Sequence, residues 1–365
     1  MHAVFVLAGY GTLLLGPILP LLSAKWSLTD SQAGLLLLSQ FCGATLGGIT
    51  VSSRLARDLL IGLAAAGAGF LAFAFAPSFA PACPALVIGG FGVGRIIATV
   101  NILAGARYTA NRAAALTRLN FTWSFGALLS PLLAAWLLPH LALVTLLTTF
   151  ASLFLLCAIA LALQLRQPSQ QTLAPPPSQP ALAPSLFLYF GALIFIYGGL
   201  ETCLAGWLTT YALRYGKTSF VLSEYTLVLL LCGLTAGRAL ASWLLLRMRD
   251  ATLQRLSLVL ATLFAAGLAL AHQATLIATL AVLLGVALAP IFPATFALLM
   301  AHRPPARTAG IILAGSGLGA AALPWLMGVI STQTSSLRTA LALPVAAALA
   351  MLALSLRTPK STSHP

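Results

Sequence analysis

The sequence predicts an all-α integral membrane protein, with twelve transmembrane helices in two parallel six-helix bundles related by pseudo-symmetry. Three observations lead to this prediction: the composition, the spacing of apolar stretches, and an internal repeat. Charged residues are 7% of the 365-residue chain and hydrophobic residues are 60%, whereas soluble domains carry about 25% charged residues. The mean hydropathy is +1.01. Lipid hydrocarbon is therefore the main solvent of this chain.

Apolar stretches of roughly 20 residues, enough to cross about 30 Å of hydrocarbon as a helix, follow one another along the sequence. The first six cover 2–23, 32–53, 59–78, 82–105, 119–139 and 142–164. The second six cover 185–208, 221–246, 256–272, 275–300, 308–331 and 339–356. A proline-rich stretch, 165–184, separates the two sets, and we expect it to be a cytoplasmic linker. The predicted units are thus an N-terminal bundle (1–164) and a C-terminal bundle with a short cytoplasmic tail (185–365).

The two halves share short sequence patterns on corresponding spans. The run Cys42–Gly47 in span 2 recurs as Cys232–Gly237 in span 8, and Gly126–Pro131 in span 5 recurs as Gly319–Pro324 in span 11. Because each half has an even number of spans, both enter the membrane in the same direction. The repeats are therefore predicted to be parallel, with their axis along the membrane normal.

The formal charge is +14, and the Lys and Arg residues are unevenly distributed between the two sides of the predicted membrane. With the N-terminus inside, thirteen Lys and Arg fall in inner loops and the tail and four in outer loops, while Arg95 and Arg238 lie inside spans. This asymmetry predicts cytoplasmic termini and explains the charge without nucleic acid. Residues 2–23 lack a basic leading segment, so we interpret them as the first span rather than a signal peptide. We expect a multi-pass protein of a bacterial plasma (inner) membrane.

Several motifs resemble the major facilitator superfamily, and more narrowly its fucose-permease-like sugar transporters. The matching pieces are Gly16–Pro20, Ser31–Gly34, Leu119–Asn120, Phe125–Pro131, Tyr197–Glu201, Gly206–Trp207 with Tyr211, Ala289–Pro293, Gly317–Gly319 and Leu323–Trp325. The resemblance implies alternating access, with spans 1, 4, 7 and 10 lining a central cavity. Two family features are missing: the acidic residue of the loop after span 2, and any carboxylate in spans 1 and 4.

Glu201 is the strongest candidate for a functional residue. It is one of five acidic residues in the chain and lies within the apolar segment 186–208, where an unpaired carboxylate costs roughly 3 kcal/mol or more. Since the resemblance places spans 4 and 7 at the same cavity, Arg95 could meet Glu201 there. Glu201 is then expected to alternate between a proton, a substrate hydroxyl and Arg95; the alternative is a permanent structural pair or a packing hydrogen bond.

Other candidate substrate-binding residues surround this one. Tyr197 lies four residues before Glu201, on the same helix face. Trp207 suits an interfacial anchor or a sugar-stacking platform equally. Amide and aromatic groups in or beside spans complete the set, each with a helix–helix hydrogen bond as the alternative role: Gln40, Asn101, Asn120 and Trp123.

A second group has an expected structural or gating role. Arg238 lies close enough to the inner end of span 8 to extend toward the surface or to bind carbonyls of a neighbouring helix. Arg57 and Asp58 end the inner loop after span 2. Pro131 and Pro324 lie inside spans, where proline kinks a helix and supplies curvature.

These features predict a secondary transporter of a small neutral polar solute, most simply a hexose or related sugar, working as a monomer and coupled to protons through Glu201. The alternative is an exporter of drugs or lipophilic metabolites, favoured by Phe121, Trp123, Phe292 and Phe296. An enzyme is not expected, because the spans offer no acid–base or nucleophile–base pair. No nucleotide-binding loop or metal-ligand spacing is present, so we expect no cofactor and no metal.

Overall fold

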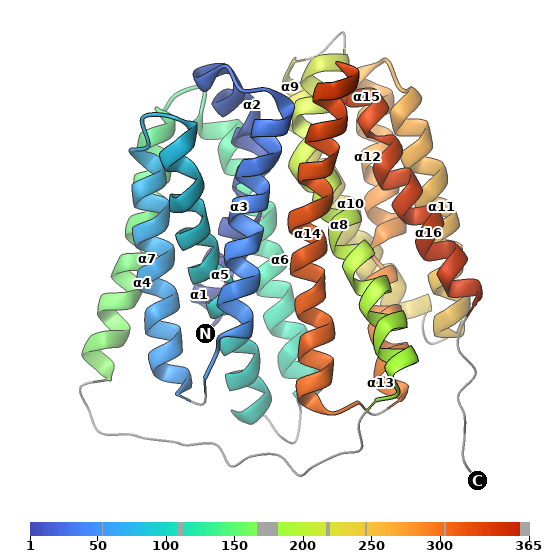
Figure 1. Ribbon diagram of the computed structural model, residues 1–365, viewed down its shortest axis with the longest axis horizontal. Coiled ribbons are helices and arrows are strands. Elements are labelled where there is room, and N and C mark those ends of the chain that lie inside the picture. The colour runs from blue at the N-terminus through green and yellow to red at the C-terminus, as the bar shows by residue number, and fades with distance from the viewer. Residues whose placement is uncertain are drawn as a thin grey trace.

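The computed structural model is a bundle of helices in two adjacent groups (Figure 1). It describes residues 1–365 except 53, 108–111, 166–181, 217–219, 245–246, 303 and 358–365. The first group contains α1 (His2–Leu13), α2 (Leu15–Trp26), α3 (Asp30–Ile49), α4 (Leu55–Ala74), α5 (Phe79–Arg107), α6 (Arg112–Leu137) and α7 (Leu143–Gln164). The second contains α8 (Pro184–Tyr215), α9 (Phe220–Glu224), α10 (Thr226–Leu244), α11 (Asp250–Leu270), α12 (Ala274–Leu288), α13 (Ile291–Ala301), α14 (Ala306–Thr334), α15 (Leu337–Ala340) and α16 (Ala342–Leu356).

The predicted twelve spans are confirmed. Among the described residues, nine helices are long and apolar enough to cross a membrane, and α1 with α2 forms a tenth span bent by 42°. Two shorter apolar helices, Phe121–Leu137 and Thr226–Ala241, supply the remaining spans. The predicted linker, residues 165–184, lies mostly outside the described residues.

The break in the first span has a local cause. Pro17 lacks an N–H group and its ring excludes the carbonyl of Leu13, four residues earlier, so the helix is interrupted at Leu14. The last carbonyls of α1 then need other donors. Gln40 of α3 supplies them, because its Nε2 donates to the carbonyls of Gly11 and Thr12 at 3.1 and 3.0 Å.

The sequence repeat corresponds to equivalent helix contacts in the two groups. A methyl group at Gly126 of α6 would overlap the Val6 carbonyl of α1, and one at Gly319 of α14 would overlap the Phe195 carbonyl of α8. In the other repeat, Gly43 of α3 meets the Val87 carbonyl of α5, and Gly233 of α10 meets the Val282 carbonyl of α12. The repeated glycines thus let the same pairs of spans approach backbone to backbone in each half.

Gly319→Ala should therefore destabilise the protein. The added methyl group has to push α14 away from α8, which we expect to cost about 1–3 kcal/mol despite the better helix propensity of alanine. Gly310→Ala is a matched control, because it lies in the same helix with no atom within 4 Å of the added carbon. Thermal unfolding in detergent should show a lower midpoint for Gly319→Ala and an equal or higher one for Gly310→Ala. Equal midpoints would show that the close approach of α14 to α8 does not contribute to the stability of the fold.

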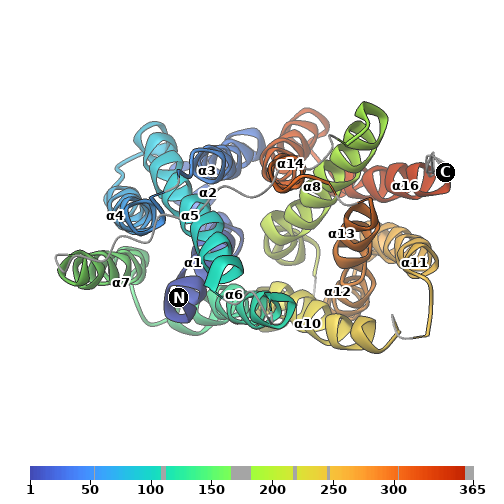
Figure 2. The same ribbon diagram turned by 90° about the horizontal axis from the view of Figure 1, so that it is seen from below.

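The two groups meet along two lines of contact. In Figure 2, α3 lies beside α14 at one edge and α6 beside α10 at the other, and both pairs are in contact. Helices α2 and α8 also touch across the boundary. Side chains that cross between the groups are therefore expected on these helices.

Candidate functional site

Glu201 lies in the middle of a spanning helix and is partly exposed. Every residue from Tyr197 to Ala212 in α8 is buried except Glu201, which is partly exposed. The rest of this stretch is enclosed by neighbouring helices, so Glu201 is the residue of the stretch with the greatest exposure.

Two ionisable groups act on Glu201. The Tyr197 hydroxyl, one turn earlier in α8, lies within hydrogen-bonding reach of the carboxylate and of the Arg238 guanidinium. The positive charge of Arg238, from α10, acts directly on the carboxylate. Arg238 also donates from Nη1 to the Ser124 hydroxyl of α6 at 2.5 Å. We call Glu201, Tyr197, Arg238 and Ser124 the central cluster; it joins helices from both halves.

Arg95 is not the partner of Glu201, so that expectation is wrong. Its guanidinium forms an ion pair with Asp58 of α4 and donates to the Thr50 hydroxyl at 2.9 Å. Asp58 is only 2% exposed and also accepts from the backbone N–H and hydroxyl of Ser52, both at 2.8 Å. The arginine side chain thus reaches the first turn of α4. The cation that meets Glu201 is Arg238.

The Asp58 ion pair changes the interpretation of the missing loop acid. The loop after Gly48 lacks the expected acidic residue, but Asp58 brings a carboxylate back to this junction from the first turn of α4. Arg57 is exposed beside it. We name this end of the molecule, which the sequence predicts to face the cytoplasm, the Asp58 end.

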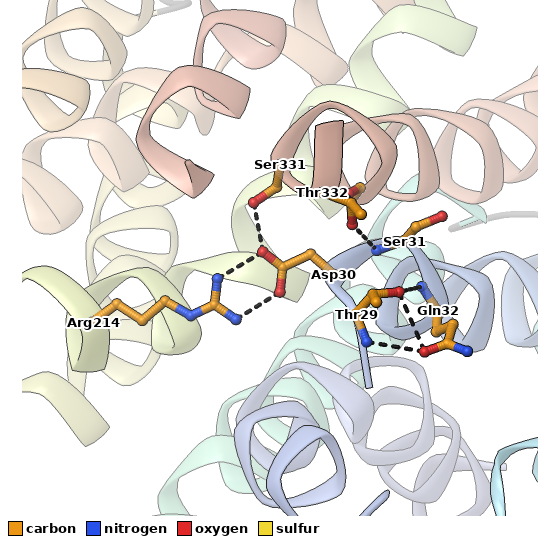
Figure 3. Close-up of polar contacts among 8 residues, drawn as sticks. Thr29, Asp30, Ser31, Gln32, Arg214, Ser331 and Thr332 are labelled. Atoms are coloured by element: carbon orange, nitrogen blue, oxygen red, sulfur yellow. Dashed lines mark hydrogen bonds and ion pairs between the residues drawn. The ribbon is translucent and has the colours of Figure 1, made fainter. Parts of the chain in front are cut away.

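At the opposite end, a set of polar contacts that the sequence did not reveal ties the two halves together (Figure 3). Arg214, near the end of α8, donates to both carboxylate oxygens of Asp30 at 2.6 Å, and the Ser331 hydroxyl of α14 donates to Asp30 Oδ2 at 2.5 Å. The Ser31 backbone N–H donates to the Thr332 hydroxyl at 2.8 Å. These five residues form the Asp30 latch, and this end is the Asp30 end.

Helix packing next to the latch is close. A methyl group at Gly328 of α14 would overlap the Asp30 carbonyl, and one at Gly16 of α2 would overlap the Ala205 carbonyl of α8. Toward the Asp58 end, by contrast, α3, α8 and α14 enclose a cleft of about 700 Å³. Apolar side chains line most of this cleft, among them Leu46, Phe195 and Ile311. The halves are thus closed at the Asp30 end and separated between these helices toward the Asp58 end.

The remaining sequence candidates have mainly structural contacts. Trp207 is 1% exposed and donates its indole N–H to the Pro324 carbonyl at 2.9 Å, so it neither anchors at the membrane surface nor offers a stacking face in this conformation. The expected roles fail because close packing of α8 on α14 encloses the indole. Asn101 donates to the Ile97 carbonyl of its own helix at 2.9 Å.

Other candidates keep only part of their expected roles. Gln40 is buried and holds the broken first span, as described above. Trp123 is half-buried in α6, one residue before Ser124. Asn120 also lies in α6, but its side chain is outside the described part of the chain. Pro131 lies inside α6, and its gating role, like that of Pro324, stays a prediction.

An aromatic wall adjoins the central cluster. The rings of Tyr197 and Phe292 are 5.6 Å apart, and Phe292 stacks on Phe296 of the same helix, α13, at 6.1 Å. Phe292 and Phe296 are both partly exposed. Charge, hydroxyl groups and an apolar face therefore occur together around Glu201.

The model of the Major Facilitator Superfamily matches residues 1–309. The chain belongs to this family. It is therefore a multi-pass membrane transporter rather than an enzyme. No curated protein sequence matches it.

Solved structures of other transporters share the fold. A bacterial homolog of the human lysosomal transporter Spinster, in an inward-facing and occupied conformation, is 14% identical, with a TM-score of 0.78 over 98% of this chain and 94% of that one. The xylose transporter XylE from E. coli, partially occluded and inward open, is 12% identical, with a TM-score of 0.78 over 100% and 97%. The E. coli fucose:proton symporter FucP is 17% identical, with a TM-score of 0.64 over 99% and 98%. At these identities the likeness concerns the fold.

Proposed function

We propose that this transporter moves a small polar solute, a hexose or a hexose derivative, together with a proton that binds Glu201. The observation that carries the proposal is the exposure of Glu201 within an otherwise buried stretch of α8, beside Tyr197 and Arg238. A carboxylate in hydrocarbon is costly, and a partly exposed carboxylate beside a cation can exchange a proton there. Fucose and xylose are named for two structural neighbours, which supports a solute of this class.

Alternating access explains why the central cluster spans both halves. Arg238 reaches from α10 to Ser124 of α6, so relative movement of the halves changes the surroundings of Glu201. The Asp30 latch closes one end in this conformation, and the cleft lies toward the other. We propose that the halves rock about the solute site, which opens the two ends in turn.

The test is solute-driven proton movement in liposomes. Purified protein is reconstituted with an internal pH dye, and hexoses and polyols are added one at a time. We expect one of them to acidify the interior, and Glu201→Gln to abolish gradient-driven accumulation while it spares exchange of labelled for unlabelled solute. Asp250→Asn is the control, because Asp250 begins α11 away from the central cluster. Unchanged accumulation in Glu201→Gln would remove Glu201 from the coupling mechanism.

Export of a lipophilic compound is the second candidate, and the apolar cleft between α3, α8 and α14 favours it. A cleft of about 700 Å³ has room for a drug-sized molecule. Efflux of an amphiphilic dye that sugars do not inhibit would support this function. Inhibition of dye movement by a sugar would instead place both compounds at the central cluster.

We also propose an orientation and a membrane for this transporter. The excess of Lys and Arg on the Asp58 side supports cytoplasmic termini and an inner-membrane location. Because both halves of the transport pathway lie in one chain, we propose that the monomer is the working unit.

A further inference from the structure

We propose that the transported solute is a monoanion, a sugar acid whose carboxylate takes the place of Glu201 beside Arg238 when Glu201 binds the proton. The inference rests on the proposed symport and names its substrate class. It follows from the charges of the central cluster, which differ from those expected for a neutral sugar.

The positions of the five acidic residues indicate that Glu201 and Arg238 balance each other's charge. The chain has five acidic residues. Asp30 pairs with Arg214 and Asp58 pairs with Arg95. Asp250 begins α11, and Glu224 lies in the short helix α9. Glu201 is the carboxylate on which the charge of Arg238 acts, so the site is electrically neutral when Glu201 is ionised.

Protonation of Glu201 changes this balance. It leaves a net charge of +1 at the centre of the transporter, where low dielectric makes an uncompensated charge expensive. A neutral sugar does not remove that charge. A carboxylate does, and then the empty carrier (Glu201 charged) and the loaded carrier (Glu201 protonated, anion bound) are both neutral. One proton and one anion would cross together without net charge.

The contacts around Arg238 suit a sugar acid. A guanidinium binds a carboxylate through two parallel N–H donors, and this planar geometry is lost with lysine. The hydroxyls of Tyr197 and Ser124 lie beside the guanidinium and can bind solute hydroxyls. Phe292, against Tyr197, offers a face for the C–H groups of a pyranose ring. Such a solute would contact α6 in one half and α8, α10 and α13 in the other.

The experiment compares matched sugars that differ only at one carbon. Proteoliposomes holding the full-length protein receive labelled D-galacturonate or D-galactose, and D-glucuronate or D-glucose, with an inward proton gradient and with potassium and valinomycin setting the membrane potential. We expect at least one acid to enter about tenfold faster than its neutral counterpart, an energy difference of about 1.4 kcal/mol. The rate of its uptake should increase with the proton gradient and should not depend on the membrane potential.

Variants separate the anion site from the proton site. Arg238→Gln should abolish uptake of the acid, and Arg238→Lys should keep part of it. Glu201→Gln should lose the response to the proton gradient but still exchange labelled for unlabelled acid, because the anion no longer needs a proton to replace the carboxylate. Loss of that exchange in Glu201→Gln, in protein that remains folded by thermal unfolding, would contradict the replacement.

The outcomes distinguish this inference from the function on which it rests. Proton-coupled, potential-dependent uptake of the neutral sugar, with no uptake of the acid, would contradict the proposal of a monoanionic solute. It would still support proton symport. Uptake of neither sugar nor acid, with efflux of an amphiphilic dye, would overturn both. Uptake of the acid without any response to the proton gradient would support an anion site at Arg238. It would contradict the coupling of anion binding to protonation of Glu201.

Discussion

Asp30→Asn should open the Asp30 end of the transporter. The substitution removes the charge that receives two N–H donors from Arg214 and the hydroxyl of Ser331. Charge-assisted hydrogen bonds contribute about 1.5–3 kcal/mol each, but the Arg214 side chain is 40% exposed, so solvent screens part of this. We expect a net loss of about 2 kcal/mol, roughly a thirty-fold shift toward the opposite conformation.

Labelling of a cysteine inside the closed interface measures this shift. Leu37 of α3 is 2% exposed and would meet a methyl group at Gly206 of α8, so Leu37→Cys reports separation of the halves. In a background without the native cysteines, a membrane-impermeant maleimide should label it slowly in the parent and much faster after Asp30→Asn. Arg214→Gln should have the same effect, and the double variant little more than either single one, because all three break one interaction.

Asp250→Asn is the matched control for the latch. Asp250 and Asp30 are each the first residue of a spanning helix, and both therefore stabilise a helix N-terminus. If Asp250→Asn accelerated labelling equally, the effect would come from the helix terminus and not from the latch. If none of the variants changed the labelling rate, the contacts of Asp30 would make no difference between the conformations.

The sequence was sufficient to predict the spans because crossing the bilayer is a local requirement. Each helix needs about 20 apolar residues, whatever it packs against. The break at Leu14 is also local, since Pro17 causes it. Glycine repeats were informative for the same reason, because Gly126 and Gly319 mark equivalent close approaches in the two halves.

Partners of charged residues could not be predicted in this way. Arg95 and Arg238 both lie inside spans, and an arginine side chain can extend several ångströms toward either end of its helix. Which one reaches Glu201 depends on how α5 and α10 face α8, which no local pattern records. Asp30 and Arg214 are 184 residues apart and looked like ordinary charges at helix ends. Their one signal was the scarcity of acidic residues.

The interaction of Glu201 with Arg238 can be measured apart from transport. Removal of one member of a buried charge pair is costly because the other charge remains, by about 3–5 kcal/mol when it is fully buried. Both side chains are partly exposed, so we expect a smaller loss, about 1–3 kcal/mol, for Glu201→Gln and for Arg238→Gln. The double variant should be less destabilised than the sum of the two, since neither unpaired charge is left.

The ion pair of Asp58 and Arg95 is a control for this comparison of single and double variants. Thermal unfolding in detergent should give the same non-additive pattern for Asp58→Asn with Arg95→Gln, because those side chains form an ion pair. Combining Glu201→Gln with Arg95→Gln should instead give an additive loss, since their interactions are separate. The opposite outcome is an additive loss of stability for Glu201 with Arg238 and a non-additive loss for Glu201 with Arg95. It would show that Arg95, and not Arg238, balances the charge of Glu201. The neutral empty site at Arg238, on which the monoanion depends, would then be lost.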